Sequence, residues 1–350
     1  MRAATATIAS RSRISLARAT AVSCRQHHPE LPVFCLLADE PHESIRPGGE
    51  PFEILELGSL RIPAEHRLRF RYGEMELSYA LTPFLIEHLL RAGFETVIFL
   101  KQETMVLDRF DGLLEQLNSA SILLTPHFLE PPSGADAFRR EWNVLRAGIF
   151  NGGVLGFSGC EEAFRVLAWW KQRTLQWCLL DVEQGLHYEQ RWLDFLPSLA
   201  PGLRIVRDPG VNVGHWNLPE RRIRVQGGRV TACGQPCRIF RFSGYDPARP
   251  DRISRYSRTM VAETGDAARV FAAYHQLLLE CGWQETHRLP YAWDRFDNGV
   301  PIPAEARRLY RALGTEAERF GDPFQTGPAD SFFHWWTRRR PRPEKEAILG

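Results

Sequence analysis

The segment Glu76–Glu103, with the sequence ELSYALTPFLIEHLLRAGFETVIFLKQE, decides the fold of this chain. Its first part, Glu76–Ala92, carries apolar side chains at helical spacing and is followed by Gly93, a residue type that commonly ends helices. Thr96–Leu100 is then a continuous apolar run with the length of a buried strand. The polar residues Lys101-Gln102-Glu103 end this run. The segment therefore predicts a helix, a buried strand and a polar turn at the carboxyl end of that strand.

Strand-like and helix-like segments alternate through the first two-thirds of the chain. The predicted strands are Thr5–Ala9, Val33–Leu37, Glu53–Glu56, Ser121–Leu124, which Pro126 stops, and Val154–Phe157; the predicted helices are Ile14–Cys24, Phe110–Leu117 and Glu161–Trp177. This alternation predicts an α/β fold with a mainly parallel, doubly wound sheet. Ligands of such sheets bind beyond the carboxyl ends of the strands. We therefore expect a cleft formed by the residues that directly follow the predicted strands.

The character of the chain changes after about residue 257. Ala267–Cys281 and Ala304–Leu313 predict helices, with aromatic-rich turns between and after them, whereas Arg222–Val230 earlier in the chain predicts a hairpin around Gly227-Gly228. We expect residues 1–256 to form the main domain, residues 257–337 to form a helical, aromatic-rich C-terminal segment, and residues 338–350 to form a basic, flexible tail.

Composition narrows the class of protein. The 350 residues are 44% hydrophobic and carry a formal net charge of +2, which is typical of a soluble globular protein and argues against a nucleic-acid binder. No apolar run approaches the roughly 18 residues of a transmembrane helix, which leaves only peripheral contact with a membrane open. The 7 cysteines are scattered, so we expect reduced thiols and a cytoplasmic protein.

Polar and aromatic residues gather at loop-like points between Gly148 and Asp246. The ordered pieces are Leu81-Thr82-Pro83, Leu124-Thr125-Pro126-His127, Gly148–Gly153, Trp169-Trp170, Gln190–Pro197, Asn212–Leu218 and Ser243–Pro247. Together they resemble a bacterial glycosyltransferase of the GT-A type, related to the family 8 enzymes that use nucleotide sugars. Later pieces are similar to the C-terminal segment of the same polysaccharide-associated proteins: Pro290-Tyr291-Ala292, Arg295–Gly299 and Phe320–Phe324.

The resemblance implies a GT-A-like doubly wound mixed sheet and transfer of a sugar from a nucleotide-diphosphate donor to an acceptor nucleophile. Such enzymes place an Asp-x-Asp motif after the fourth strand, because Mn²⁺ and Mg²⁺ require oxygen ligands. Here these positions read Lys101-Gln102-Glu103, and Arg241 stands where the late motif has a His. Only Glu103 could still bind a metal.

The exchange of two metal ligands for two cations has two interpretations. In the first, Lys101 and Arg241 stabilise the departing phosphate, and the enzyme is independent of metal. In the second, the chain is a non-catalytic nucleotide-binding relative or a scaffold in polysaccharide or natural-product assembly. Hydrolysis of the donor sugar is a third alternative. The donor base, the sugar, the acceptor and the stereochemical outcome remain open.

Glu189-Gln190 matches an Asp-Gln pair of the family, near the place where donor sugar and acceptor meet. Glu189 is a candidate general base, and Gln190 is a candidate sugar ligand. The alternative is an exposed helix start. Asp194 lies one helical turn later, on the face of Gln190, where it orients the site or caps a loop.

The remaining candidates line the pocket. Asn151 precedes Gly152-Gly153, which permit close approach of the backbone to a ligand, although Asn-Gly is also a common turn. The other candidate ligands of the donor are Asn212, His215, Trp216, Asn217, Ser243 and Gly244, and His215 beside Trp216 is equally compatible with packing. For the nucleotide, the candidates are Ser10, Arg13 and Asp39, and the alternative for Asp39 is a helix cap.

Overall fold

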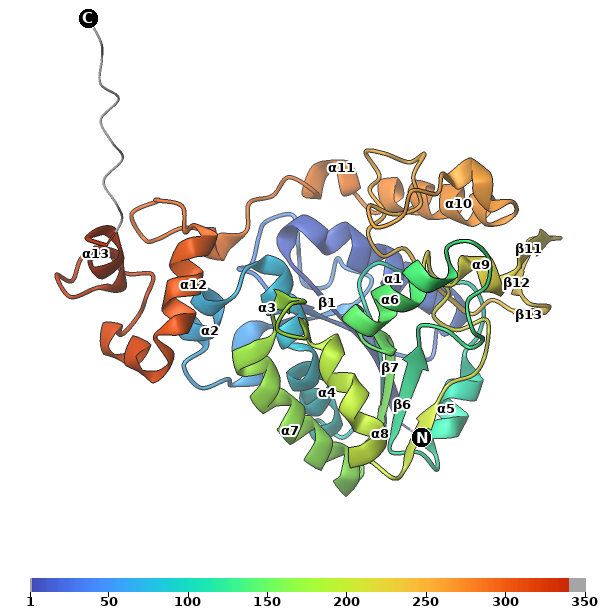
Figure 1. Ribbon diagram of the computed structural model, residues 1–350, viewed down its shortest axis with the longest axis horizontal. Coiled ribbons are helices and arrows are strands. Elements are labelled where there is room, and N and C mark those ends of the chain that lie inside the picture. The colour runs from blue at the N-terminus through green and yellow to red at the C-terminus, as the bar shows by residue number, and fades with distance from the viewer. Residues whose placement is uncertain (1, 340–350) are drawn as a thin grey trace, which may run out of the picture.

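The computed structural model describes residues 2–339, which form an α/β fold around a 7-stranded sheet (Figure 1). The strand order is β10-β6-β7-β4-β1-β2-β3. The strands are β1 Ala3–Ala9, β2 Val33–Leu37, β3 Glu53–Glu56, β4 Thr96–Leu100, β6 Ile122–Pro126, β7 Phe150–Ser158 and β10 Leu203–Ile205. Strand β7 runs antiparallel to both of its neighbours, β4 and β6, and the other pairs are parallel. The predicted α/β fold with a doubly wound mixed sheet is confirmed.

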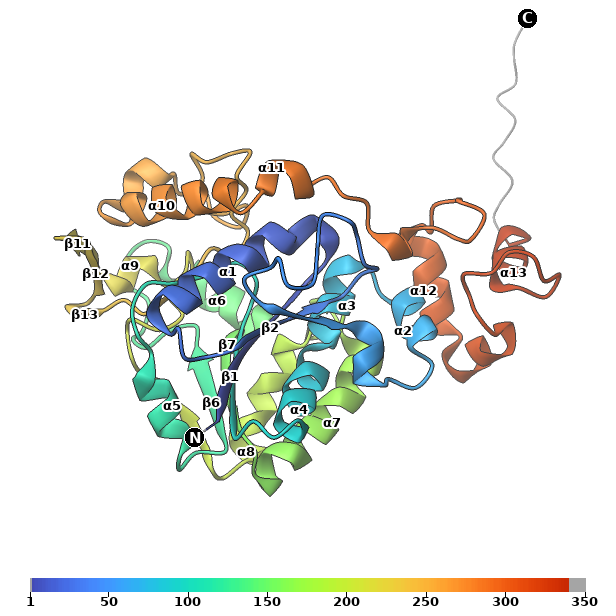
Figure 2. The same cartoon turned by 180° about the vertical axis from the view of Figure 1, so that it is seen from behind.

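Helices cover both faces of the sheet (Figures 1 and 2). The helices on one face are α3 Glu74–Ala80, α4 Thr82–Arg91 and α7 Glu161–Trp177, and those on the other are α1 Ile14–His27 and α5 Asp111–Leu117. In β4, Val97 and Phe99 enter the first core, whereas Ile98 and Leu100 enter the second. This two-sided burial explains why the strand is an unbroken apolar run rather than an alternating one.

The helix predicted over Glu76–Ala92 is two helices, α3 and α4, which meet at Leu81. Pro83 lies in the first turn of α4. Proline has no backbone N–H and therefore cannot extend the hydrogen-bond ladder of a preceding helix, although it fits the first turn of a new one. Apolar spacing continues across the break, so spacing alone could not show it.

Two strands at the centre of the sheet are longer than predicted. Strand β6 continues through Pro126, and β7 begins at Phe150 rather than at Val154. The register between them shifts, because Leu124 pairs with Leu155 while Thr125 pairs with Asn151. Irregular pairing of this kind bends a strand and redirects its side chains, often beside a functional site. The residues Asn151-Gly152-Gly153, which look like a loop in the sequence, lie in this irregular stretch of β7.

Shorter elements complete the main part of the molecule. They are β5 Thr104–Val106, which pairs with β14 Ile239–Arg241; β8 Leu180–Asp181 with β9 Leu186–His187; β11 Ile223–Gln226, β12 Arg229–Ala232 and β13 Gln235–Pro236; and α2 Glu65–Arg71, α6 Ala137–Ala147, α8 Leu196–Leu199 and α9 Leu218–Arg221. The predicted hairpin around Gly227-Gly228 is confirmed by β11 and β12. No helix within residues 2–339 is long and apolar enough to cross a bilayer. All 7 cysteines are free.

The C-terminal segment contains α10 Ala267–Glu280, α11 Trp283–Thr286, α12 Ala304–Ala312 and α13 Phe332–Thr337. Helix α10 lies along α1, and α12 lies beside α2 (Figure 2). Phe70 of α2 is fully buried against aromatic rings of the segment, and Arg307 donates to the carbonyl oxygens of Phe70 at 2.6 Å and Tyr72 at 2.8 Å. The predicted tail, 338–350, lies outside the described residues except for Arg338 and Arg339.

Candidate functional site

The carboxyl ends of four strands lie at one edge of the sheet, where β7 begins. Ser10 follows β1, Asp39 follows β2 after one residue, Lys101 follows β4, and His127 follows β6. Asn151 is the second residue of β7 at the same edge. The ladder between β4 and β7 continues into this region, because the backbone N–H of Lys101 donates to the carbonyl of Gly153 at 2.9 Å. The strand order thus gathers candidate residues that are far apart in the sequence.

Lys101 and Glu189 form a buried ion pair. The ammonium Nζ of Lys101 lies 2.5 Å from Oε1 of Glu189, and the two residues are 5% and 0% exposed. The same ammonium lies 3.8 Å from the ring centroid of Tyr79. Burial lowers the pKa of Lys101, and Glu189 opposes this effect. Trp170 fixes the backbone of Glu189 by donating from Nε1 to its carbonyl oxygen at 3.1 Å.

Arg241 and Glu103 form a second buried ion pair. The ladder between β5 and β14 pairs Arg241 with Thr104, which sets the guanidinium beside the carboxylate of Glu103 at an Nη2–Oε1 distance of 2.7 Å. Burial alone would raise the pKa of Glu103, but Arg241 and Lys101 outweigh it and hold that pKa below its usual value. The guanidinium also lies 5.6 Å from the ring centroid of Trp216. Both members of this pair are therefore charged.

Asn151 connects the second ion pair to the strand ends. Its Oδ1 accepts from Nη1 of Arg241 at 2.6 Å, from the backbone N–H of Gly153 at 2.9 Å and from Nδ2 of Asn212 at 3.2 Å. Its Nδ2 bonds to Nε2 of His127 at 3.0 Å. With every polar atom engaged, the amide of Asn151 has one orientation, and its oxygen faces the guanidinium.

The two glycines of β7 permit this arrangement. A Cβ on Gly152 would lie 2.9 Å from Oε1 of Glu189, and a Cβ on Gly153 would lie 2.5 Å from Cδ of Arg241. Any side chain here would displace one of the charged groups. Gln190 holds this stretch, since its Oε1 accepts from the N–H of Gly152 at 2.9 Å and its Nε2 donates to the carbonyl of Ala147 at 3.0 Å.

Among the buried polar atoms of the site that have no hydrogen-bond partner in the described part of the chain are Oδ1 of Asn212 and Nε1 of Trp216. Asn217 supports the loop that carries them, because its Oδ1 accepts from the N–H of Gly214 at 2.8 Å and its Nδ2 donates to the carbonyl of Asn212 at 3.2 Å. Burying an unpaired polar atom costs free energy. A ligand that bonds to these two atoms would remove that cost.

Other predicted candidates support the site without joining the Asn151 network. Asp194 accepts from the backbone N–H of Ile149 at 2.9 Å and so fixes the start of β7. His215 packs against the rings of Trp216 and Tyr256. The last two, Ser243 and Gly244, lie in a turn, where the carbonyl of Ser243 accepts from Ser254.

The predicted nucleotide ligands form a separate group. The hydroxyls of Ser10 and Ser12 donate to Glu74, and Nε of Arg13 lies 3.6 Å from the same carboxylate. Asp39 accepts from the backbone N–H of Ala292 at 3.0 Å, so the C-terminal segment reaches this carboxylate. Within residues 2–339, no hydrogen bond joins this group to the Asn151 network.

The residues at the Asp-x-Asp position do not fit a divalent metal ion. Glu103 is the one carboxylate there, and Arg241 already occupies it. Lys101 adds a second buried cation. In the described residues, the one cluster of three metal-ligating side chains is His28, Glu30 and Asp111, where Arg109 bridges the two carboxylates at 2.7 Å each.

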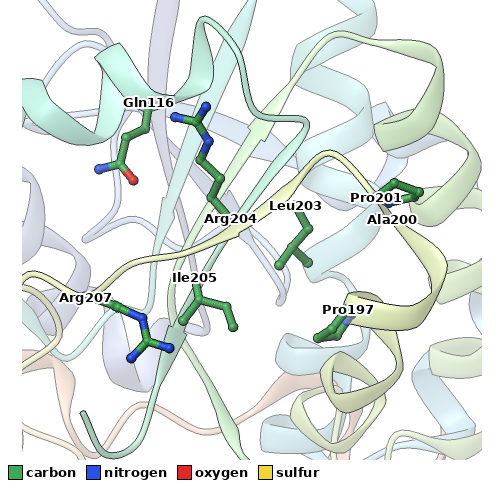
Figure 3. A pocket seen from close by; sticks show the side chains of 8 residues that line it. All are labelled: Gln116, Pro197, Ala200, Pro201, Leu203, Arg204, Ile205 and Arg207. Atoms are coloured by element: carbon green, nitrogen blue, oxygen red, sulfur yellow. The ribbon is translucent and has the colours of Figure 1, made fainter.

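A hollow on the molecular surface lies elsewhere. Figure 3 shows the side chains that line it: Gln116, Pro197, Ala200, Pro201, Leu203, Arg204, Ile205 and Arg207. It follows β10 at the edge of the sheet and shares no residue with the two ion pairs. We place the functional site at the ion pairs because the buried charges and unpaired polar atoms gather there.

Three residues of the site were missed or given no role by sequence reasoning. Tyr79 supplies the ring beneath Lys101, Thr125 accepts from Nδ2 of Asn212 at 2.6 Å, and His127 orients Asn151. The position of Thr125 and His127 at the end of a predicted strand was a usable signal. Tyr79 lies within a helix, and nothing in the sequence indicates its contact with Lys101.

Three histidines with lowered pKa values predict a loss of stability in mild acid; His127 is buried, and His187 and His215 are half-buried. Burial lowers the pKa of His127 to about 3, of His187 to about 4 and of His215 to about 4. Between pH 6.5 and these values the unfolded chain binds protons that the folded chain cannot. The free energy of unfolding should therefore fall as the pH drops below 6.5, by up to about 1.4 kcal/mol per pH unit for each histidine. Urea denaturation at pH 7 and at pH 5 measures the difference in the free energy of unfolding.

His215→Gln serves as the comparison, because it removes one of the three groups and should flatten the dependence on pH. Equal stability of the natural protein at pH 7 and pH 5 would contradict the expectation.

No family model matches the chain. The chain is similar to two uncharacterized proteins of Bacillus subtilis (strain 168). YfnF is 25% identical over 70% of this chain and 82% of YfnF, and YfnD is 23% identical over 68% of this chain and 76% of YfnD. Among solved structures, the galactosyltransferase LgtC in complex with donor and acceptor sugar analogues matches with a TM-score of 0.49 and 15% identity, over 83% of this chain and 98% of that one. These values are too low to show a family or an activity, so the functional conclusion rests on the site.

Proposed function

We propose that this protein is a glycosyltransferase that takes its sugar from a nucleotide-diphosphate donor and uses Lys101 and Arg241 in place of a metal ion. One observation carries the proposal. Two buried cations flank adjacent glycines of β7 at the carboxyl edge of the sheet, where such folds bind ligands. The placement in polysaccharide biosynthesis rests on the sequence resemblance.

Lys101 and Arg241 can stabilise the negative charge that develops on the departing diphosphate during sugar transfer. The bond between the anomeric carbon and the phosphate oxygen breaks, and its electron pair goes to the nucleoside diphosphate. The acceptor oxygen bonds to the anomeric carbon and passes its proton to a base, for which Glu189 is the candidate. Arg241 uses donors on Nε, Nη1 and Nη2 for Glu103 and Asn151, and an arginine has five donors in all. Lys101 has three donors and one ion-pair partner. Each cation therefore has N–H groups left for phosphate oxygens.

The two acids hold these cations in place. Taken together, the two ion pairs are neutral, so attraction of a diphosphate depends on where the cations point rather than on net charge. Glu189 is fully buried against Lys101, and we assign it first to positioning that ammonium. The predicted role of Glu189 as general base requires Oε2, which has no partner among the described residues, to face the acceptor.

The sugar would lie against the loop of Asn212–Asn217. The unpaired Oδ1 of Asn212 accepts from a hydroxyl, and the unpaired Nε1 of Trp216 donates to one. Gln190 has both ends of its amide on the backbone, and in this proposal it positions Gly152 rather than the sugar.

A thermal-shift screen tests the function. Purified protein is heated with UDP-, GDP-, dTDP- and CMP-sugars, each with Mn²⁺ and with chelator. We expect one nucleotide to raise the melting temperature equally in both conditions, because a ligand that binds only the folded state stabilises it. Release of nucleoside diphosphate from that donor then measures turnover.

A shift that requires Mn²⁺ would contradict metal independence but not sugar transfer. Absence of a shift with every donor would contradict the donor site, and the ion pairs would then be structural features of a non-catalytic relative.

A further inference from the structure

Helix α6, Ala137–Ala147, carries an apolar stripe that faces away from the protein. None of its 11 residues is buried. Phe138 is 73% exposed, Trp142 is 50% exposed and Leu145 is 60% exposed, and Ile149 just beyond the helix is 51% exposed. Phe138, Trp142 and Leu145 follow one another at spacings of four and three, which places them on one side of the helix, and Ile149 adds an exposed apolar side chain just after its end.

The opposite side of α6 faces the molecule. Ala137, Arg140, Val144 and Ala147 are half-buried there. Arg140 donates from Nη2 to the carbonyl of Trp216 at 3.1 Å, which ties the helix to the loop of the candidate site. The helix therefore turns Arg140 and three small or medium apolar residues toward the molecule and its largest apolar residues outward. Burial against this chain cannot explain that arrangement.

We propose that this stripe docks the protein on the surface of an anionic lipid bilayer. The stripe is a convex ridge of Phe, Trp, Leu and Ile, the side chains that interfacial helices bury between headgroups and acyl chains. Phe138 and Trp142 stack at 6.0 Å between ring centroids, so both rings enter together.

Charge on the flank of the stripe supports the lipid surface over other occupants. Arg139 and Arg146 are exposed and lie on one side of the stripe, where their guanidinium groups would meet lipid phosphates, with Arg139 exchanging its exposed partner Asp136, at 2.9 Å, for a phosphate. Glu141 lies on the other side. The apolar surface also continues past the helix. The backbone N–H of Ile149 donates a hydrogen bond to Asp194, which brings the next residue, Phe195, close to the stripe, and Phe195 is 54% exposed. Interfacial helices insert their apolar side chains roughly 5–10 Å into the bilayer, a depth that a single layer of exposed side chains such as this stripe can reach.

Vesicle co-sedimentation tests the proposal with the full chain and without any sugar donor, so its outcome does not depend on the proposed function. We expect the natural protein to pellet with vesicles of phosphatidylcholine and phosphatidylglycerol and to pellet less with phosphatidylcholine alone. The double variant Phe138→Ser/Trp142→Ser should lower the partition coefficient at least about tenfold. The charge variant Arg139→Glu/Arg146→Glu should remove the preference for anionic vesicles.

Matched controls use exposed residues on other elements. Val22→Ser/Val300→Ser removes two apolar residues that are each 39% exposed, and Arg258→Glu reverses an exposed charge. Both controls should bind vesicles as the natural protein does. Circular dichroism checks that all variants fold.

Three outcomes would overturn the proposal. The natural protein could fail to pellet with any vesicle, or the stripe variant could bind as well as its control. Sedimentation velocity could instead show a dimer that the stripe variant abolishes while vesicles bind neither form, and the occupant would then be a second copy of the chain.

Discussion

Replacing Arg241 with methionine is expected to lower turnover of the donor by about 10²–10³, because removal of one preorganised group that stabilises developing charge typically has this effect. The same change leaves the carboxylate of Glu103 buried without its partner. Breaking a buried ion pair from one side costs about 3–5 kcal/mol, so the single variant should also be markedly less stable. The rate of nucleoside diphosphate release and a urea denaturation curve measure the two effects.

The double variant Glu103→Met/Arg241→Met separates chemistry from folding. It removes both charges of the pair, and replacing a buried ion pair with apolar groups of similar volume is often neutral. Stability should therefore recover while turnover stays low. Arg238→Met is the matched control, since it breaks an ion pair with Asp208 at 2.9 Å on a partly exposed surface nearby. Recovery of turnover in the double variant would show that Arg241 acts only on the fold.

Gly153→Ala is expected to have the second largest effect. The new Cβ would lie 2.5 Å from Cδ of Arg241 and 2.7 Å from Oδ1 of Asn151. The side chains of Arg241 and Asn151 are hydrogen-bonded to each other, so neither can move away without loss of that hydrogen bond. Crowding of this kind costs about 1–3 kcal/mol. We also expect the affinity for the donor to fall at least about tenfold, which corresponds to about 1.4 kcal/mol, because the guanidinium is displaced.

Gly112→Ala is the matched control for this steric argument. Gly112 lies within α5, and a Cβ there would meet no atom within 4 Å. Alanine in a helix is favoured over glycine by about 1 kcal/mol, so this variant should be slightly more stable than the natural protein. Denaturation curves and donor titrations compare the two variants. Equal behaviour of Gly153→Ala and Gly112→Ala would contradict the crowding argument.

Most of the central sheet could be predicted from the sequence because its strands are buried on both faces. Thr96–Leu100 and Val33–Leu37 have the bounds that their apolar runs indicate, and every residue of both strands is buried. The start of β7 could not be predicted in this way. Asn151-Gly152-Gly153 has the composition of a turn, and only pairing with β4 and β6 holds it in a strand. Helix α6 was missed although Phe138, Trp142 and Leu145 lie at helical spacing, because this stripe is exposed and does not mark a buried face.

The candidate site was predictable in its location but not in its contacts. The carboxyl ends of the strands indicate Lys101, and the sequence resemblance adds Glu189 and Arg241. That Lys101 pairs with Glu189, while Arg241 pairs with Glu103, depends on how distant segments cross at the edge of the sheet. No spacing in the sequence encodes such a crossing. The structure therefore turns two isolated cations into two neutral pairs, which changes how a diphosphate would be attracted.

The hydrogen bonds from Arg307 to the end of α2 affect how the chain folds during its synthesis. Helix α2 leaves the ribosome long before α12, and at that stage Phe70 and the carbonyl oxygens of its last turn lack their final partners. These partners arrive only when α12 has also been made. Until then the Phe70 ring, fully buried in the finished protein, has no aromatic cluster to enter. Nascent or truncated chains that stop before Arg307 should therefore be the forms that chaperones retain and proteases remove.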